Sequence, residues 1–309
     1  MWIKEPGKIA DRIDFLGTYD MCLYLLRGKD AMIIGGGMSY VAPCLETQLS
    51  RMEFDLDRIR YLVIPHSHFD HCGAVPYLKR RFPRMEVLAS AYSKEVFSKK
   101  KVVSYIADVN KRMIEKSGLQ GEYERLNLQI DEIKVDRVVR EKDVVDLGDG
   151  IEARFIEVPG HSRCCIGTYV PCLGAIFPTD AAPFPTGAQG ELSYPSAQYD
   201  FSAYLESLSK LVAHDVQLCA FDHHGVLVGE QAKDVLRRGL VHAEQVKNDI
   251  IEQYRVTGDM DKTARKLASE ILEKSDLPYM SQELMTTITK AMISGIIRKE
   301  SNGSRKSSS

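Results

Sequence analysis

The feature that most constrains the fold of this chain is a dense cluster of potential metal ligands that directly follows a short apolar run. Three of the eight histidines and one aspartate lie within the six residues from His66 to His71, in the pattern His-x-His-x-Asp-His. The apolar run before them, residues 61–65, is typical of a buried strand, and a helical pattern begins near Gly73. Loops at the carboxyl ends of strands are where α/β folds usually hold their reactive groups. The cluster therefore predicts an α/β fold with a metal site at one sheet edge.

The spacing within the cluster predicts ligands for two ions. His66 and His68 are two residues apart, so in an extended loop both side chains point to the same side and chelate one ion. Asp70 and His71 lie beyond the bend and are expected to face a second ion nearby. Imidazole nitrogen and carboxylate oxygen suit zinc, iron, manganese or cobalt better than calcium or magnesium.

Three later stretches supply further donors, and each of them follows an apolar run. His161 lies in the turn Pro-Gly-His, Asp180 follows Phe-Pro-Thr, and the adjacent pair His223 and His224 follows Phe-Asp. Because all of these residues follow predicted strands, one cleft at the strand ends is expected to collect them.

The remaining pattern predicts an α/β body followed by a helical C-terminal region. Up to about residue 225, short apolar runs alternate with helical patterns; the predicted strands are residues 21–26, 31–35, 61–65, 86–89, 134–139, 152–158, 165–170, 175–178 and 216–221. The predicted helices are residues 42–52, 74–81, 93–116 and 201–212, and then 231–254, 261–274 and 282–299. We expect a body over residues 1–228, a helical cap over 229–300 and a disordered tail over 301–309.

Composition excludes several classes of protein. The 309 residues carry a formal net charge of −2, which favours neither nucleic acid nor an acidic surface. The seven cysteines are scattered without Cys-x-x-Cys spacing, which is typical of reduced thiols rather than of a disulfide framework. No apolar window is long enough for a membrane span, and no basic and apolar leader opens the chain. We therefore expect a cytoplasmic protein with a small-molecule substrate and without nucleic-acid or membrane partners. Whether the protein forms a homodimer is left open by the sequence.

The combination of motifs resembles the metallo-β-lactamase superfamily. The likeness rests on His-x-His-x-Asp-His, then Gly-His, then an aspartate and a histidine at strand ends, in that order over residues 15 to 225. It implies a four-layer αββα sandwich with a dinuclear site at one edge, here extended by C-terminal helices. In the ligand set that it implies, one ion is held by His66, His68 and His161, the other by Asp70, His71 and the last histidine, and Asp180 bridges the two.

Two positions depart from the superfamily pattern. The usual His-Gly ending favours His224 as the last ligand, whereas alignment of the following Gly-Val-Leu-Val-Gly with thioesterase-type relatives favours His223, so both stay candidates. Many members carry Asp-x-Gly after an early strand, but here the residues are Gly35-Gly36-Gly37. Since that acid usually orients other ligands, its absence concerns positioning rather than metal binding.

A closer likeness is to the quinolone-signal response thioesterase type, which has an iron-containing dinuclear centre. It is carried by His71-Cys-Gly-Ala-Val-Pro-Tyr-Leu78, by Val87-Leu-Ala-Ser90, by Tyr204-Leu-Glu-Ser-Leu208 and by the helical C-terminus. The extra helices would then form a lid over the cleft.

These features predict a metal-dependent hydrolase of the metallo-β-lactamase type. Two divalent ions, zinc or iron with manganese also suited, would share a hydroxide that cleaves a thioester or another acyl ester. Asp70 would bind metal and also accept or orient the proton of that hydroxide, as the superfamily pattern implies. The alternatives are a di-iron redox protein that binds oxygen or nitric oxide, and a regulatory protein that retains the site.

Overall fold

The computed structural model describes residues 1–274 and 279–306, and these form two compact units. The first unit comprises Met1–Glu157, Cys164–Thr179 and Asp215–Lys233. The second comprises Val158–Arg163, Asp180–His214 and the chain from Asp234 onward. The domain boundary expected near residue 228 stays a prediction.

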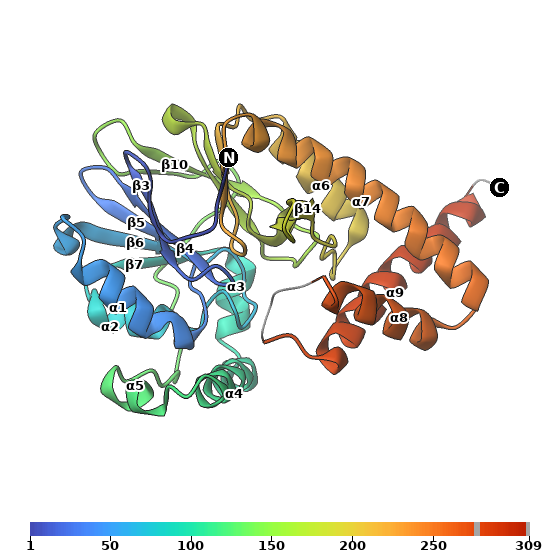
Figure 1. The fold of residues 1–309 in the computed structure, drawn as a ribbon, viewed down its shortest axis with the longest axis horizontal. Coiled ribbons are helices and arrows are strands. Elements are labelled where there is room, and N and C mark those ends of the chain that lie inside the picture. Colours follow the sequence, from blue (N-terminus) through green and yellow to red (C-terminus); the bar gives the residue numbers. More distant parts are fainter. Residues whose placement is uncertain (275–278, 307–309) are drawn as a thin grey trace. The chain divides into compact units, whose positions relative to one another are not determined.

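The first unit is built on two seven-stranded sheets (Figure 1). One sheet has the order β2-β3-β4-β5-β6-β7-β8, antiparallel from β2 to β5 and parallel from β5 to β8. Its strands are β2 Gly7–Ala10, β3 Ile13–Gly17, β4 Cys22–Arg27, β5 Ala31–Ile34, β6 Ile59–Val63, β7 Glu86–Ala89 and β8 Arg137–Val138.

The other sheet has the order β1-β16-β15-β12-β11-β10-β9, in which only β12 and β15 are parallel neighbours. Its strands are β1 Trp2–Ile3, β9 Val144–Asp146, β10 Glu152–Glu157, β11 Ile166–Val170, β12 Ala175–Phe177, β15 Leu218–Ala220 and β16 Val226–Val228. Side chains from both sheets, among them Phe15, Tyr24, Phe155 and Phe177, form one buried cluster. The two sheets therefore pack face to face with the core between them.

Five complete α-helices belong to the first unit: α1 Ala42–Ser50, α2 Val75–Arg81, α3 Ala91–Phe97, α4 Lys100–Lys116 and α5 Gln120–Arg125. Helices α1 and α2 lie along the outer face of the first sheet (Figure 1), and both faces of β4 and β5 are accordingly buried. The sequence predicts one helix over residues 93–116, but the structure has two. Ser90 accepts a hydrogen bond from the Ser93 N–H at the start of α3, and the chain leaves the helical conformation at Lys99 before α4 begins.

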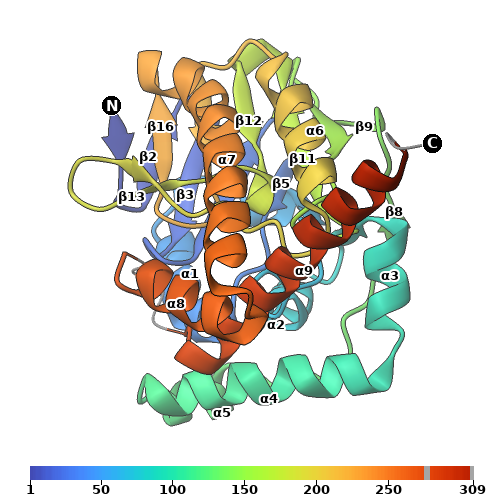
Figure 2. The same ribbon diagram turned by 90° about the vertical axis from the view of Figure 1, so that its right-hand side faces the viewer.

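The second unit is mainly helical. It contains the hairpin of β13 Pro185–Thr186 and β14 Glu191–Leu192, then α6 Phe201–Val212, most of α7 Glu230–Thr257, α8 Met260–Leu272 and α9 Gln282–Lys306. Helices α8 and α9 pack side by side (Figure 2), with Ala264, Leu267 and Ala268 of α8 buried as the apolar stripe predicts.

The C-terminal helix extends further than expected. Helix α9 continues to Lys306, into the segment from 301 onward for which the sequence predicts disorder, and residues 307–309 lie outside the described residues. Extending an existing helix requires no new nucleation, which is why a polar end can remain helical. None of the helices in residues 1–274 and 279–306 combines the length and the apolar character that crossing a bilayer requires.

Candidate metal centre

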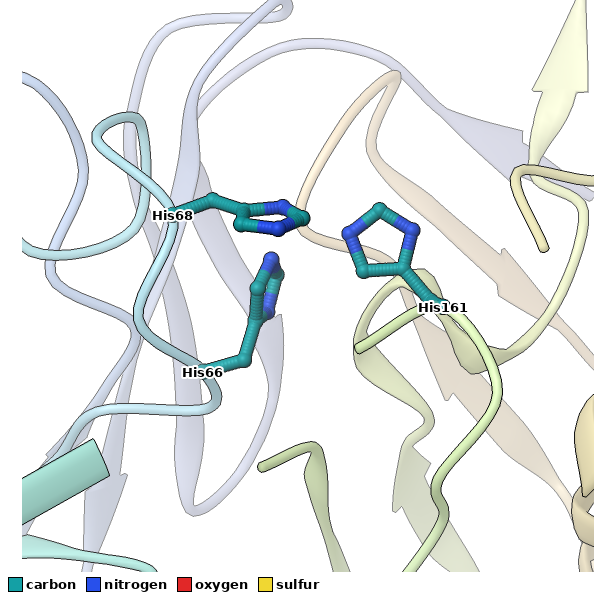
Figure 3. Close-up of side chains that lie close together, drawn as sticks. All are labelled: His66, His68 and His161. Carbon is teal, nitrogen blue, oxygen red and sulfur yellow. The ribbon is translucent and has the colours of Figure 1, made fainter. Parts of the chain in front are cut away.

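The ligand cluster lies on the loop that follows β6. Strands β5, β6 and β7 are parallel and end at the same edge of the first sheet, as the sequence predicts for this position. The loop carries His66 and His68 into one close pair, with ring centroids 4.7 Å apart and the rings edge to face (Figure 3). The ring of His71 lies 4.0 Å from that of His66, so the first and last histidines of the cluster also meet.

A glycine-rich loop after β5 fixes the far end of this cluster. The Gly73 N–H donates to the Gly37 carbonyl at 2.7 Å, and the Ala74 N–H donates to the Gly36 carbonyl at 2.9 Å. A Cβ atom at Gly36 would lie 2.4 Å from the carbonyl oxygen of His71, which is closer than any real contact. The close approach of the two loops explains why residue 36 has no side chain, and Gly35, where the acid of Asp-x-Gly would lie, has φ +98°, a conformation that favours glycine.

Three potential ligands of the first unit converge around one point. Asp70, His71 and His223 each offer one ligand atom, and these atoms all lie within 4.8 Å of one another. The Asp70 Oδ2 atom is 3.4 Å from Nε2 of His71 and 3.8 Å from Nε2 of His223. All three residues are buried, which is unusual for a carboxylate and two imidazoles unless charge is balanced by a partner such as a metal ion.

Two imidazoles of the first unit are connected through Nδ1 to the same carboxylate, one directly and the other through a hydroxyl group. Nδ1 of His71 lies 3.1 Å from Oδ2 of Asp222, and Nδ1 of His66 lies 3.1 Å from the hydroxyl of Thr179. That hydroxyl donates its own proton to Oδ2 of Asp222 at 2.8 Å, so its oxygen is the acceptor toward His66. Both histidines therefore carry their proton on Nδ1.

A third imidazole, that of His223, is held by a backbone carbonyl. Nδ1 of His223 donates to the Asp20 carbonyl at 2.7 Å, and the Asp20 side chain accepts hydrogen bonds from Thr18 at 2.7 Å and from Tyr40. Burial and then the charge of Asp20 raise the pKa of Tyr40, so its hydroxyl stays a donor. The loop that holds His223 is thus itself braced.

This hydrogen bonding fits a metal ion. A neutral imidazole with a proton on Nδ1 has its lone pair on Nε2, the usual arrangement of a metal-ligating histidine. With Asp70 beside them, His71 and His223 form a set of nitrogen and oxygen donors that zinc, iron or manganese accept. The residues of this site therefore suit a divalent metal ion.

His161 and Asp180 both lie in the second unit and form a pair of their own. Nδ1 of His161 donates to the Ser196 carbonyl at 2.7 Å, and its Nε2 lies 3.3 Å from Oδ2 of Asp180. Gly160 has φ +137°, and a Cβ there would lie 2.3 Å from the backbone of Tyr204, so the turn requires glycine. His161, the third side chain labelled in Figure 3, thus follows the same Nδ1 pattern as the histidines of the first unit.

The two histidines that the sequence leaves as alternatives have different surroundings. His223 belongs to the group with Asp70 and His71, whereas the ring of His224 stacks on Tyr19 at 4.5 Å with 12° between the planes. The backbone of His224 is also anchored, since its N–H donates to Tyr19 and its carbonyl accepts from the Trp2 indole at 2.7 Å. His224 joins no group of potential ligands in the described part of the chain.

Sequence reasoning missed the residues that form hydrogen bonds with the predicted ligands. Asp222 and Thr179 are each adjacent to a predicted ligand, but a carboxylate or a hydroxyl at a strand end gives no sign of its partner. Cys72, next to the cluster, also forms a hydrogen bond with this loop: its buried thiol donates to the His68 carbonyl at 3.1 Å, and burial raises the pKa of the thiol. The available signal was the position of Asp222 directly before two histidines.

A two-sheet α/β fold with histidine and aspartate side chains at its strand ends indicates a metal-binding class of protein, and comparison with known proteins identifies the family. The family model described as "Metallo-beta-lactamase superfamily" matches residues 21–223. Among curated proteins, the metallo-beta-lactamase fold-containing protein ST1585 of Sulfurisphaera tokodaii is 26% identical over 196 residues, which is 63% of this chain and 72% of that protein. This chain belongs to the metallo-beta-lactamase superfamily.

Solved structures show the same fold. The structure of ST1585 from Sulfolobus tokodaii aligns with TM-score 0.54 and 18% identity, covering 76% of this chain and 99% of that one. The family protein TTHA1429 from Thermus thermophilus aligns with TM-score 0.64 and 13% identity over 96% of this chain and 95% of its own. MEM-A1, a subclass B3 metallo-beta-lactamase from a soil metagenome library, aligns with TM-score 0.57 and 17% identity over 80% and 97%. The predicted fold class, the metallo-β-lactamase fold with a C-terminal helical region, is confirmed.

Proposed function

We propose that this protein is a dinuclear metal hydrolase that cleaves a thioester or another acyl ester. The superfamily and the cluster of histidines and aspartates indicate a metal-dependent hydrolase in general terms. The observation that carries the proposal is the hydrogen bonding of three histidines. His66, His71 and His223 each donate from Nδ1 to an oxygen atom, which leaves the lone pair on Nε2 free to bind metal.

The two ions would be divided between ligands as follows. His66, His68 and His161 would hold one ion, Asp70, His71 and His223 would hold the other, and Asp180 would be a ligand of both. That His161 and Asp180 of the second unit bind the same ions as the ligands of the first unit is itself proposed. Two observations support it: the residues follow the order of the superfamily pattern along the chain, and His161 donates from Nδ1 to a backbone carbonyl, as His223 does.

The chemistry divides between the ions and the chain. When bound, a pair of divalent ions lowers the pKa of a shared water toward neutrality and polarises the bond to be cleaved. Asp70 would help to hold a metal ion and would also orient or accept a proton of the attacking water. The buried surroundings of Asp70 and His71 strengthen these charge interactions because little water screens them.

The substrate class rests on the closer resemblance rather than on the geometry. The thioesterase-type motifs around His71 and Tyr204 favour an acyl thioester or ester. We further propose that the substrate is a small molecule and that neither nucleic acid nor a membrane is a partner, in keeping with the net charge of −2.

Metal analysis joined to an assay panel tests the function. Protein purified anaerobically should contain two zinc or iron ions per chain and should hydrolyse at least one member of a panel of thioesters, lactones and phosphodiesters. His68→Ala should lose one ion and nearly all turnover. His214 lies just after α6 and belongs to no group of potential ligands among the described residues, so His214→Ala should retain both.

Two results would redirect the proposal. Two iron atoms without turnover of any ester, together with binding of oxygen or nitric oxide, would favour the redox alternative. A cellular activity that survives His68→Ala would favour the regulatory one. Wild-type protein that takes up no metal would overturn the hydrolase proposal itself.

A further inference from the structure

We propose that Asp222 is a positioning residue for both ions of the centre, acting directly on His71 and through Thr179 on His66. The inference rests on the proposed dinuclear function, in which His71 and His66 serve different ions. It gives one buried carboxylate control over a ligand of each ion.

The contacts of Asp222 converge on a single oxygen. Its Oδ2 atom lies 3.1 Å from Nδ1 of His71 and accepts the Thr179 hydroxyl at 2.8 Å. Since Thr179 in turn accepts from Nδ1 of His66 at 3.1 Å, the protons of both imidazoles lead to the same carboxylate. Asp222 is only 3% exposed, so water cannot replace it as the acceptor.

The backbone of Thr179 supports a functional role for its hydroxyl. Thr179 has φ +51°, a conformation that β-branched residues rarely adopt and that costs free energy. The strained residue is 2% exposed, and its hydroxyl links His66 to Asp222 through two hydrogen bonds. Strain of this kind persists where the surrounding structure over-determines the conformation.

Asp222 also accounts for the acid missing from the early Asp-x-Gly position. In the Gly35-Gly36-Gly37 loop the acid would fall on Gly35, whose φ of +98° side chains rarely adopt. Asp222 enters from the other sheet, at the end of β15, and supplies a buried carboxylate next to His71. The orienting charge is therefore retained although its position in the sequence has changed.

Titration of the metal-free protein with cobalt(II) chloride tests the inference, with visible absorption and calorimetry as readouts. Wild-type protein should bind two equivalents. Asp222→Asn, which keeps the size but removes the charge, should weaken both equivalents by about 10- to 100-fold. Thr179→Val should weaken only the equivalent that His68→Ala abolishes, and Thr179→Ser, which keeps the hydroxyl, should stay close to wild type.

The outcomes separate this inference from the proposed function. If Asp222→Asn binds both equivalents of cobalt as tightly as wild type does, the positioning role is overturned. It is also overturned if Thr179→Val weakens the binding of both equivalents alike. Wild-type protein that binds no cobalt overturns the metal centre itself. If Asp222→Asn fails to fold, as judged by circular dichroism without metal, the pair Thr179→Val and Thr179→Ser decides the relay to His66.

Discussion

At the scale of single residues, the two adjacent histidines that follow β15 illustrate how one backbone torsion separates two roles. His224 has φ +63°, in the left-handed region, so its side chain leaves on a different side from that of His223. His223 thereby meets Asp70 and His71, and His224 stacks on Tyr19. The sequence cannot reveal this reversal, because the two residues are of the same type and only one of them adopts positive φ.

Substitution of each histidine should give opposite results. His223→Ala should lower the metal content by about one ion per chain, because it removes the Nε2 donor, and should leave the fold intact. His224→Ala should keep the metal content and lower the free energy of unfolding by about 1–3 kcal/mol through the lost ring stacking and packing. Elemental analysis and urea unfolding measure the two effects. Loss of metal from His224→Ala with retention in His223→Ala would reverse the assignment.

At the scale of elements, the strands that the sequence misses are those whose apolar pattern is interrupted or short. β3 contains Asp14 between Ile13 and Phe15, and the carboxylate pairs in the structure with Arg27 of β4 at 2.7 Å. Burial raises the pKa of Asp14 even with this partner beside it, because water no longer solvates the carboxylate fully. β16 has only three residues, and pairing with β15 and β1 defines it. Such strands depend on partners distant in sequence.

A polar clamp between α2, β7 and the chain before β8 gives a prediction about stability. The Asp136 carboxylate accepts from the Val87 N–H at 3.1 Å and from Lys79 at 2.9 Å. Burial alone raises the pKa of Asp136, but these two donors outweigh it and hold the pKa below its usual value of 3.8. Because the folded-state pKa is lowered, the stabilisation is complete above the unfolded-state pKa and is lost as pH falls through the folded-state pKa.

Asp136→Asn should therefore lower the free energy of unfolding by about 1–3 kcal/mol at pH 7, and the difference from wild type should shrink below about pH 4. Urea unfolding at a series of pH values measures both. Lys134→Ala provides the control: its ammonium lies 3.8 Å from Asp136 but is 68% exposed, so the change should be small at every pH. A pH-independent difference for Asp136→Asn would contradict the role of its charge.

At the scale of the whole molecule, the order of ligand-bearing stretches was enough to predict the family and the fold class. The spacing of His66, His161, Asp180 and the last histidine depends on strand exits, and strand exits recur in a fixed order within one fold. The orienting residues could not be predicted in this way. Asp222 and Thr179 act on histidines more than a hundred residues away along the chain, and only the packed sheets bring these together.

Metal binding should stabilise the whole molecule, because its ligands are distant along the chain and meet only in the folded state. His71 and His223 are separated by about 150 residues, so the unfolded chain cannot reproduce their arrangement. Free metal at about 100 times its dissociation constant should add about 2.7 kcal/mol, which corresponds to a rise in Tm of about 4 °C for a chain of this size. Differential scanning calorimetry with zinc and with a chelator measures the shift. His223→Ala should reduce this shift and His224→Ala should not, whereas equal Tm values with and without metal in the wild type would show that the ligands do not bind metal.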